Sequence, residues 1–124
     1  MATILIVEDE EALSEALSDK LIREGHKTYI ENTGLNILKI IKNKNFDLIL
    51  LDLIMPKRTG LEVLEDLKND PEVRKTPVIV LSGLSDDETI KKALRLGAVD
   101  YFVKANHPIS EVVEKVKVYL SKPK

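Results

Sequence analysis

The sequence predicts an α/β fold: a doubly wound, three-layer sandwich in which five helices cover a five-stranded parallel sheet of strand order 2-1-3-4-5. Five short apolar runs alternate with segments of helical periodicity, which is the pattern of βα units around a parallel sheet. The runs at 3–7, 47–51 and 77–81 are almost entirely apolar, as expected for strands covered on both faces. The run at 26–30 is more polar, which places that strand at an edge.

The first half of the chain supplies three helices. The first is predicted over residues 10–24, with Gly25 as its stop signal. Its apolar face comprises Leu13, Ala16, Leu17 and Leu21. Thr33 is predicted to cap the second helix. That helix carries Leu35, Leu38 and Ile41. The third helix follows Gly60 and ends at 69–71, where Asn-Asp-Pro stops it. Its inward residues are Leu61, Leu64 and Leu67.

The second half supplies the last two strands and helices. Ser85 and Glu88 have the spacing of a capping box, so the fourth helix is predicted to open at Ser85 and to stop at Gly97. The fifth strand is expected within the apolar run 98–103. The fifth helix has an apolar face made of Ile109, Val112, Val113, Val116 and Leu120.

The length and composition indicate one soluble domain. At 124 residues the chain can bury one core but not two, and we expect a domain over 1–121 with a short tail at 122–124. A formal charge of -2 gives no attraction to nucleic acid, so direct nucleic-acid binding is not expected. The absence of cysteine excludes disulfides and thiolate metal sites and fits a cytoplasmic location. The N-terminal apolar run is too short for membrane insertion.

Three carboxylates follow two of the apolar strands. Asp52 ends the run 47–51, and Glu8 and Asp9 end the run 4–7. The carboxyl ends of parallel strands meet at one edge of a sheet, where ligands collect. If the three groups converge there, they need a bound cation or a pKa shift that neutralises one of them. All-oxygen ligation favours Mg²⁺ or Mn²⁺, whereas zinc would have no His or Cys cluster.

Ser82 and Lys104 end the fourth and fifth strands at the same edge. A phosphoryl group carried on Asp52 would need a cation, a hydroxyl donor and a counter-charge, and these groups supply them. The alternative is that Asp9 merely caps the first helix and Asp52 ends its strand in solvent. The joint presence of all five groups favours the site over this alternative.

The order and spacing of these residues resemble the response-regulator receiver domain (CheY-like) of bacterial two-component signalling, which has a flavodoxin-like fold. The resemblance covers essentially the whole chain and rests on Glu8-Asp9, Asp52-Leu53-Ile54-Met55-Pro56 with Gly60, Ser82, and Asp100-Tyr101-Phe102-Val103-Lys104. It implies that Asp52 accepts a phosphoryl group from a histidine kinase or phosphotransfer protein. It also implies that Asp9, Asp52 and the backbone carbonyl of Ile54 bind Mg²⁺ directly, with Glu8 acting through water.

The resemblance further implies that Tyr101 is a switch residue. Its ring would turn inward as Ser82 moves towards the phosphoryl group; the alternative is an ordinary half-exposed strand tyrosine. The face formed by the fourth helix, the fifth strand and the fifth helix would then bind an unidentified downstream protein. The chain would act as a monomer or as a phosphorylation-dependent dimer. It would catalyse its own phosphotransfer and dephosphorylation without being a metabolic enzyme.

The residues argue against two other functions. A haloacid-dehalogenase-like phosphohydrolase also phosphorylates an aspartate, but it needs a second acid two positions on, where this chain has Ile54. A flavin- or nucleotide-binding protein would need a phosphate loop after the first strand, where residues 8–11 are all acidic.

His26 and His107 are expected at the surface, without an acidic partner at ligand spacing. Ala105 replaces the proline that commonly follows the lysine of receivers through a cis bond.

Overall fold

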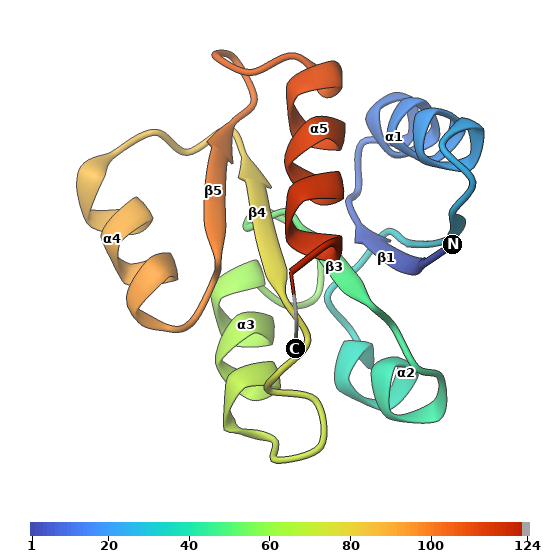
Figure 1. The fold of residues 1–124 in the computed structure, drawn as a ribbon. Coiled ribbons are helices and arrows are strands. Elements are labelled where there is room, and N and C mark those ends of the chain that lie inside the picture. Colours follow the sequence, from blue (N-terminus) through green and yellow to red (C-terminus); the bar gives the residue numbers. More distant parts are fainter. Residues whose placement is uncertain (123–124) are drawn as a thin grey trace.

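The computed structural model describes residues 1–122 and contains one parallel sheet between two layers of helices (Figure 1). The sheet order is β2-β1-β3-β4-β5, and each neighbouring pair is parallel. The strands are β1 (Thr3–Val7), β2 (Lys27–Glu31), β3 (Leu48–Leu51), β4 (Val78–Ser82) and β5 (Asp100–Val103). The predicted fold class and strand order are therefore confirmed. Residues 123 and 124 of the predicted tail lie outside the described residues.

Five helices cover the two faces of the sheet. They are α1 (Glu11–Arg23), α2 (Ile37–Asn43), α3 (Gly60–Asn69), α4 (Asp87–Arg95) and α5 (Ile109–Leu120). Alternate residues of the central strands face α1 and α5 on one side, and α2, α3 and α4 on the other. In β1, for example, Ile4 and Ile6 pack on the α1 and α5 side, and Leu5 and Val7 pack on the side of α2, α3 and α4. Burial on both faces explains why these strands are continuous apolar runs.

The strand register brings the polar residues that follow the strands to one edge. Val7 is paired with Leu51, so the residues after β1 and β3 lie side by side. The amide of Asp52 donates to the carbonyl of Val7 at 2.9 Å. The amide of Lys104 donates to the carbonyl of Ser82, also at 2.9 Å. The backbone register of the sheet is thus enough to bring the residues of the candidate site to one edge, independently of side-chain contacts.

The predicted start of the second helix was wrong. Helix α2 begins at Ile37, after Asn36 in the left-handed conformation (φ 65°). Thr33 does not cap it, because the Thr33 hydroxyl accepts from the amide of Leu35 in a local turn (3.3 Å). Leu35 lies outside the helix and is exposed. Gly34 holds this turn against the loop after β3, since a Cβ there would overlap the carbonyl oxygen of Arg58.

Helix caps and one helix face also differ from prediction. The cap of α4 is Asp86 rather than Ser85, and its carboxylate accepts from the amide (3.1 Å) and hydroxyl (2.7 Å) of Thr89. Aspartate is a strong N-cap, and here it prevails over a serine one residue earlier. The capping box occurs instead on α3, between Thr59 and Glu62. In α1, Ala16 is exposed; the residues buried on this helix are Ser14, Leu17, Ser18 and Leu21.

Among residues 1–122, no helix combines the length and apolar character needed to cross a bilayer.

Candidate functional site

Three carboxylates gather at the carboxyl edge of the sheet. Glu8 and Asp9 follow β1, and Asp52 follows β3. One carboxylate oxygen from each lies within 4.8 Å of the others. Asp9 is exposed, whereas Glu8 and Asp52 are 2% and 3% exposed. The structure thus brings together the three acids that the sequence predicted as a cluster, and it buries two of them.

Lys104 provides the positive charge that compensates these buried acids. Its Nζ lies 3.0 Å from Glu8 Oε1 and 3.2 Å from Asp52 Oδ2. It also lies 2.8 Å from Glu10 Oε1, a contact that sequence reasoning missed. Burial alone would lower the pKa of Lys104, but the pairs with Glu10, Glu8 and Asp52 more than offset this and raise it. The side chain therefore remains an ammonium over the whole physiological range.

Glu8 is the acid whose ionisation is most affected by the site. Burial raises its pKa from 4.5 to about 7. The hydrogen bond from the Glu10 amide (3.1 Å) and the pair with Lys104 oppose this rise, while the charge of Asp52 adds to it. Without a further cation, Glu8 is therefore partly protonated near neutral pH.

Ser82 and Tyr101 are connected through the loop after β4. Ser82 is fully buried, and its Oγ accepts from the amide of Leu84 (3.3 Å). The Tyr101 hydroxyl donates to the carbonyl of Leu84 at 2.8 Å, and its ring packs against the core on the α2–α3–α4 side. Burial raises the pKa of Tyr101, and the nearby Ser82 hydroxyl partly offsets that rise. Tyr101 is thus connected to Ser82 through Leu84.

The loop after Asp52 is held by close backbone contacts. The Asp52 carboxylate accepts from the amide of Ile54 at 3.3 Å. The Gly60 amide donates to the carbonyl of Leu53 at 2.9 Å. A Cβ at Gly60 would overlap the carbonyl oxygen of Asp52, so only glycine fits this approach. The start of α3 therefore lies directly against the backbone of the candidate acceptor.

Comparison with known families decides which family this chain belongs to. The profile of the response regulator receiver domain matches residues 4–117. This chain belongs to the response regulator receiver domain family. Its closely similar relatives include DivK of Brucella ovis, a polar-differentiation response regulator that is 31% identical over 121 residues, with 95% of each chain covered.

Solved receiver structures share the same architecture. The receiver domain of Francisella response regulator 1452 superposes with a TM-score of 0.90 at 27% identity and covers 100% of both chains. The Mn²⁺-bound response regulator Rcp1 superposes with a TM-score of 0.87 at 26% identity, over 100% of this chain and 98% of that one. Several curated relatives are longer, and this chain spans only 22% to 54% of four of them.

The donors present in this receiver domain suit a hard divalent cation. The cluster offers carboxylate oxygens only, which Mg²⁺ and Mn²⁺ prefer. The raised pKa of Glu8 also favours a bound cation, because a cation would offset the negative charge that burial disfavours. Ile54 lies beside Asp52, and the role of its backbone carbonyl as a ligand remains a prediction.

The receiver domain departs from expectation at one histidine. His107 Nδ1 lies 2.9 Å from Glu111 Oε1, a partner four residues on that sequence reasoning overlooked. The ring also packs edge-on against Phe102, with centroids 5.0 Å apart.

In the described residues no peptide bond is cis, so Lys104 and Ala105 are joined by a trans bond.

Proposed function

We propose that this receiver domain is a switch that takes a phosphoryl group onto Asp52 from the phosphohistidine of a histidine kinase or phosphotransfer protein. One observation carries the proposal: the ammonium of Lys104 contacts both buried acids, Asp52 at 3.2 Å and Glu8 at 3.0 Å. A buried carboxylate with a fixed counter-charge beside it is prepared to receive a group that brings about two further negative charges. The family supports the same class of function.

The transfer follows from groups already in place. An oxygen of Asp52 bonds to phosphorus as the bond between phosphorus and the histidine nitrogen breaks, and that nitrogen keeps the electron pair. Lys104 then faces a phosphoryl oxygen as well as the carboxylate. Mg²⁺, held by Asp9, Asp52 and the Ile54 carbonyl with Glu8 acting through water, would supply further positive charge to the phosphoryl oxygens. Mn²⁺ could take its place.

Ser82 links this chemistry to Tyr101. In the structure the Ser82 hydroxyl accepts from the amide of Leu84, and the carbonyl of the same residue accepts from the Tyr101 hydroxyl. A phosphoryl oxygen is a strong acceptor, so the Ser82 hydroxyl would turn towards it. Movement of Ser82 would shift Leu84, whose carbonyl holds the Tyr101 hydroxyl, and would so couple the position of the Tyr101 ring to the phosphorylation state. Tyr101 and Ser82 thus form the proposed two-state element.

We do not propose a metabolic enzyme. Ile54 occupies the position where an aspartate-based phosphohydrolase places its general acid, and an isoleucine cannot transfer a proton. The chain would catalyse its own phosphorylation and its own dephosphorylation, and its output would be binding.

A first prediction tests the metal. Asp9→Ala is expected to abolish phosphorylation by acetyl phosphate and to leave the fold intact, because Asp9 is exposed and Asp52 keeps Lys104. EDTA should stop labelling of the unmodified protein in the same way. The measurement is the mass gain of one phosphoryl group over time. Asp19→Ala, at an exposed position of α1, is the matched control. Labelling at the normal rate in EDTA would contradict the metal role.

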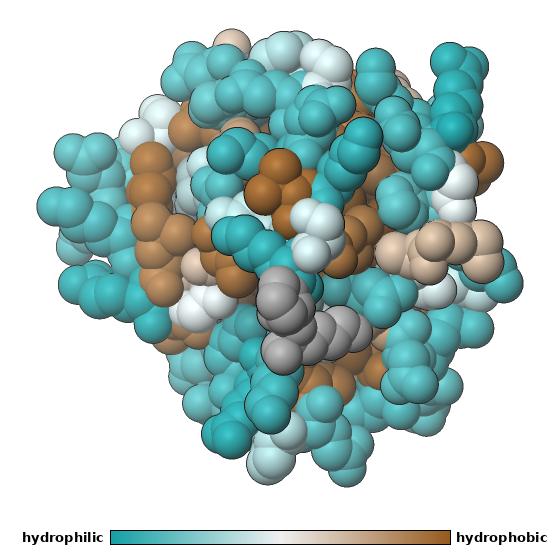
Figure 2. Space-filling model, viewed as in Figure 1, coloured by the Kyte–Doolittle hydropathy of each residue, from teal (hydrophilic) through white to brown (hydrophobic). Residues whose placement is uncertain are grey.

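A second prediction tests the output face. Leu94 on α4, Val99 before β5 and Val118 on α5 are exposed apolar residues of this region, and Figure 2 shows hydrophobic side chains there among hydrophilic ones. Beryllofluoride, a phosphoryl mimic, is expected to shift amide resonances across residues 82–104. Shifts confined to residues 8–9 and 52–56 would mean that the change stays at the site. Light scattering with and without the mimic separates a monomer from a phosphorylation-dependent dimer.

A further inference from the structure

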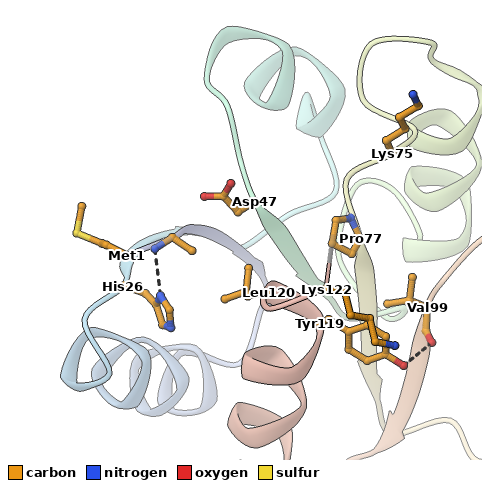
Figure 3. A pocket seen from close by; sticks show the side chains of 10 residues that line it. Met1, His26, Asp47, Lys75, Pro77, Val99, Tyr119, Leu120 and Lys122 are labelled. Carbon is orange, nitrogen blue, oxygen red and sulfur yellow. Dashed lines mark hydrogen bonds between the residues drawn. The ribbon is translucent and has the colours of Figure 1, made fainter. Parts of the chain in front are cut away.

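A cavity of about 480 Å³ opens at the amino edge of the sheet, opposite Asp52 (Figure 3). Its walls come from residues that precede each of the five strands, from the last turn of α5 and from Lys122 just beyond it. None of these residues belongs to the phosphoryl site described above. The volume lies within the range of small-molecule sites, about 300 to 1,000 Å³.

The body of the cavity is apolar and partly rigid. Pro77, Val99, Leu120 and the ring of Tyr119 line it. The Tyr119 hydroxyl donates to the Val99 carbonyl (3.0 Å) and to Asp100 Oδ2 (3.1 Å). These bonds fix the ring and satisfy its polar atom, so the ring contributes an apolar surface. Val99 is 37% exposed, and a ligand could cover this apolar side chain.

The rim of the cavity presents more donors than acceptors. Lys75 and Lys122 lie on one side in Figure 3, and His26 and Asp47 lie on the other. His26 Nδ1 accepts from the amide of Ala2 (3.2 Å), so the neutral ring carries its proton on Nε2 and acts there as a donor. Among the described lining residues Asp47 is the one acid, and its Oδ2 already accepts from the amide of Thr3 (2.8 Å).

We propose that this cavity binds a small amphipathic anion, namely a carboxylate with an aromatic or branched aliphatic body. The body would lie against Val99, Leu120 and the Tyr119 ring. The carboxylate would face the ammonium of Lys122, and Lys75 would add positive charge at the outer edge of the cavity. Lys122 already rests its Nζ 4.5 Å from the centroid of the Tyr119 ring, which places a cation at the boundary of the apolar wall. A divalent cation is disfavoured, because the described lining residues include two lysines and a single acid, Asp47, whose carboxylate already accepts from the Thr3 amide.

The probe for this site is 1-naphthoate, with the uncharged 1-naphthamide as its matched analogue. Titration of the full chain is expected to give saturable amide shifts at residues 1–3, 75–77, 99–100 and 119–122, and weaker shifts with the amide. The double variant Lys75→Gln, Lys122→Gln should raise the Kd of naphthoate about fivefold, since an exposed ion pair is worth up to about 1 kcal/mol. Lys91→Gln, Lys92→Gln on α4 is the matched control.

The Val99→Asp variant supplies an independent arm, because it places a negative charge in the apolar wall at an exposed position. It should abolish naphthoate binding while its spectrum remains that of the folded protein. Three results would overturn the proposal: shifts that map to other surfaces, equal affinity for the acid and the amide, or no saturation up to about 5 mM, a concentration corresponding to only about 3 kcal/mol of binding.

Discussion

Asp52→Asn is expected to remove all phosphorylation of this receiver domain by acetyl phosphate and Mg²⁺. The amide has nearly the shape of the carboxylate but cannot form the acyl phosphate, so the loss is one of chemistry. The backbone bond from the Asp52 amide to the Val7 carbonyl does not depend on the side chain, and the site should keep its shape. Intact mass spectrometry gives the result directly, as the absence of one added phosphoryl mass.

The matched control is Asp87→Asn, which makes the same change in the exposed first turn of α4. This control should be phosphorylated at the normal rate. If Asp52→Asn were labelled as fast as the unmodified protein, another residue would be the acceptor and the proposed function would need a different site.

Glu8→Gln is expected to make the metal-free protein more stable above pH 7 by about 3 kcal/mol. In the folded protein burial raises the pKa of Glu8 to about 7, against 4.5 in the unfolded chain. The folded state therefore holds this proton more tightly, and its stability falls as pH rises from 4.5 to about 7. One unit of pKa difference corresponds to about 1.4 kcal/mol, and glutamine avoids the whole cost.

Urea unfolding in EDTA at pH 8 and at pH 4.5 measures this effect. The gain should be largest at pH 8 and nearly vanish at pH 4.5, where the wild-type carboxyl is mostly protonated in the folded state. Glu114→Gln, an exposed acid of α5, is the control and should change little at either pH. A Glu8→Gln protein that is less stable at pH 8 would mean that the pair with Lys104 outweighs burial.

Much of the fold could be predicted because two signals in the sequence locate the strands. The strands themselves are apolar runs, and segments of helical periodicity lie between them. The same pattern located the site, since each of Glu8, Asp52, Ser82 and Lys104 follows or ends a strand. Parallel strands then leave only one edge where they can meet. The convergence of the acids and Lys104 was therefore predictable without any side-chain geometry.

The helix caps could not be predicted, because neighbouring polar side chains compete for the same backbone amides. Thr33 and Ser85 both have cap-forming side chains, but Thr33 closes a turn instead and Asp86 takes the cap of α4. Glu10 joins Lys104 although the two residues are 94 positions apart in the sequence. The amino-edge cavity combines segments from the whole chain, and no sequence spacing marks it. Such features depend on packing between distant segments.

This site can be damaged by losing a reactive side chain or by losing the backbone alignment that Gly60 permits. It carries no reactive atom, yet a single methyl group at this position would press on the main chain of Asp52. Sequence drift at position 60 would therefore misplace the acceptor while every charged group stayed present. A search for functional relatives that scored only acids, serine and lysine would accept such a chain as competent. The glycine is the part of the motif that distinguishes an aligned site from a complete but misaligned one.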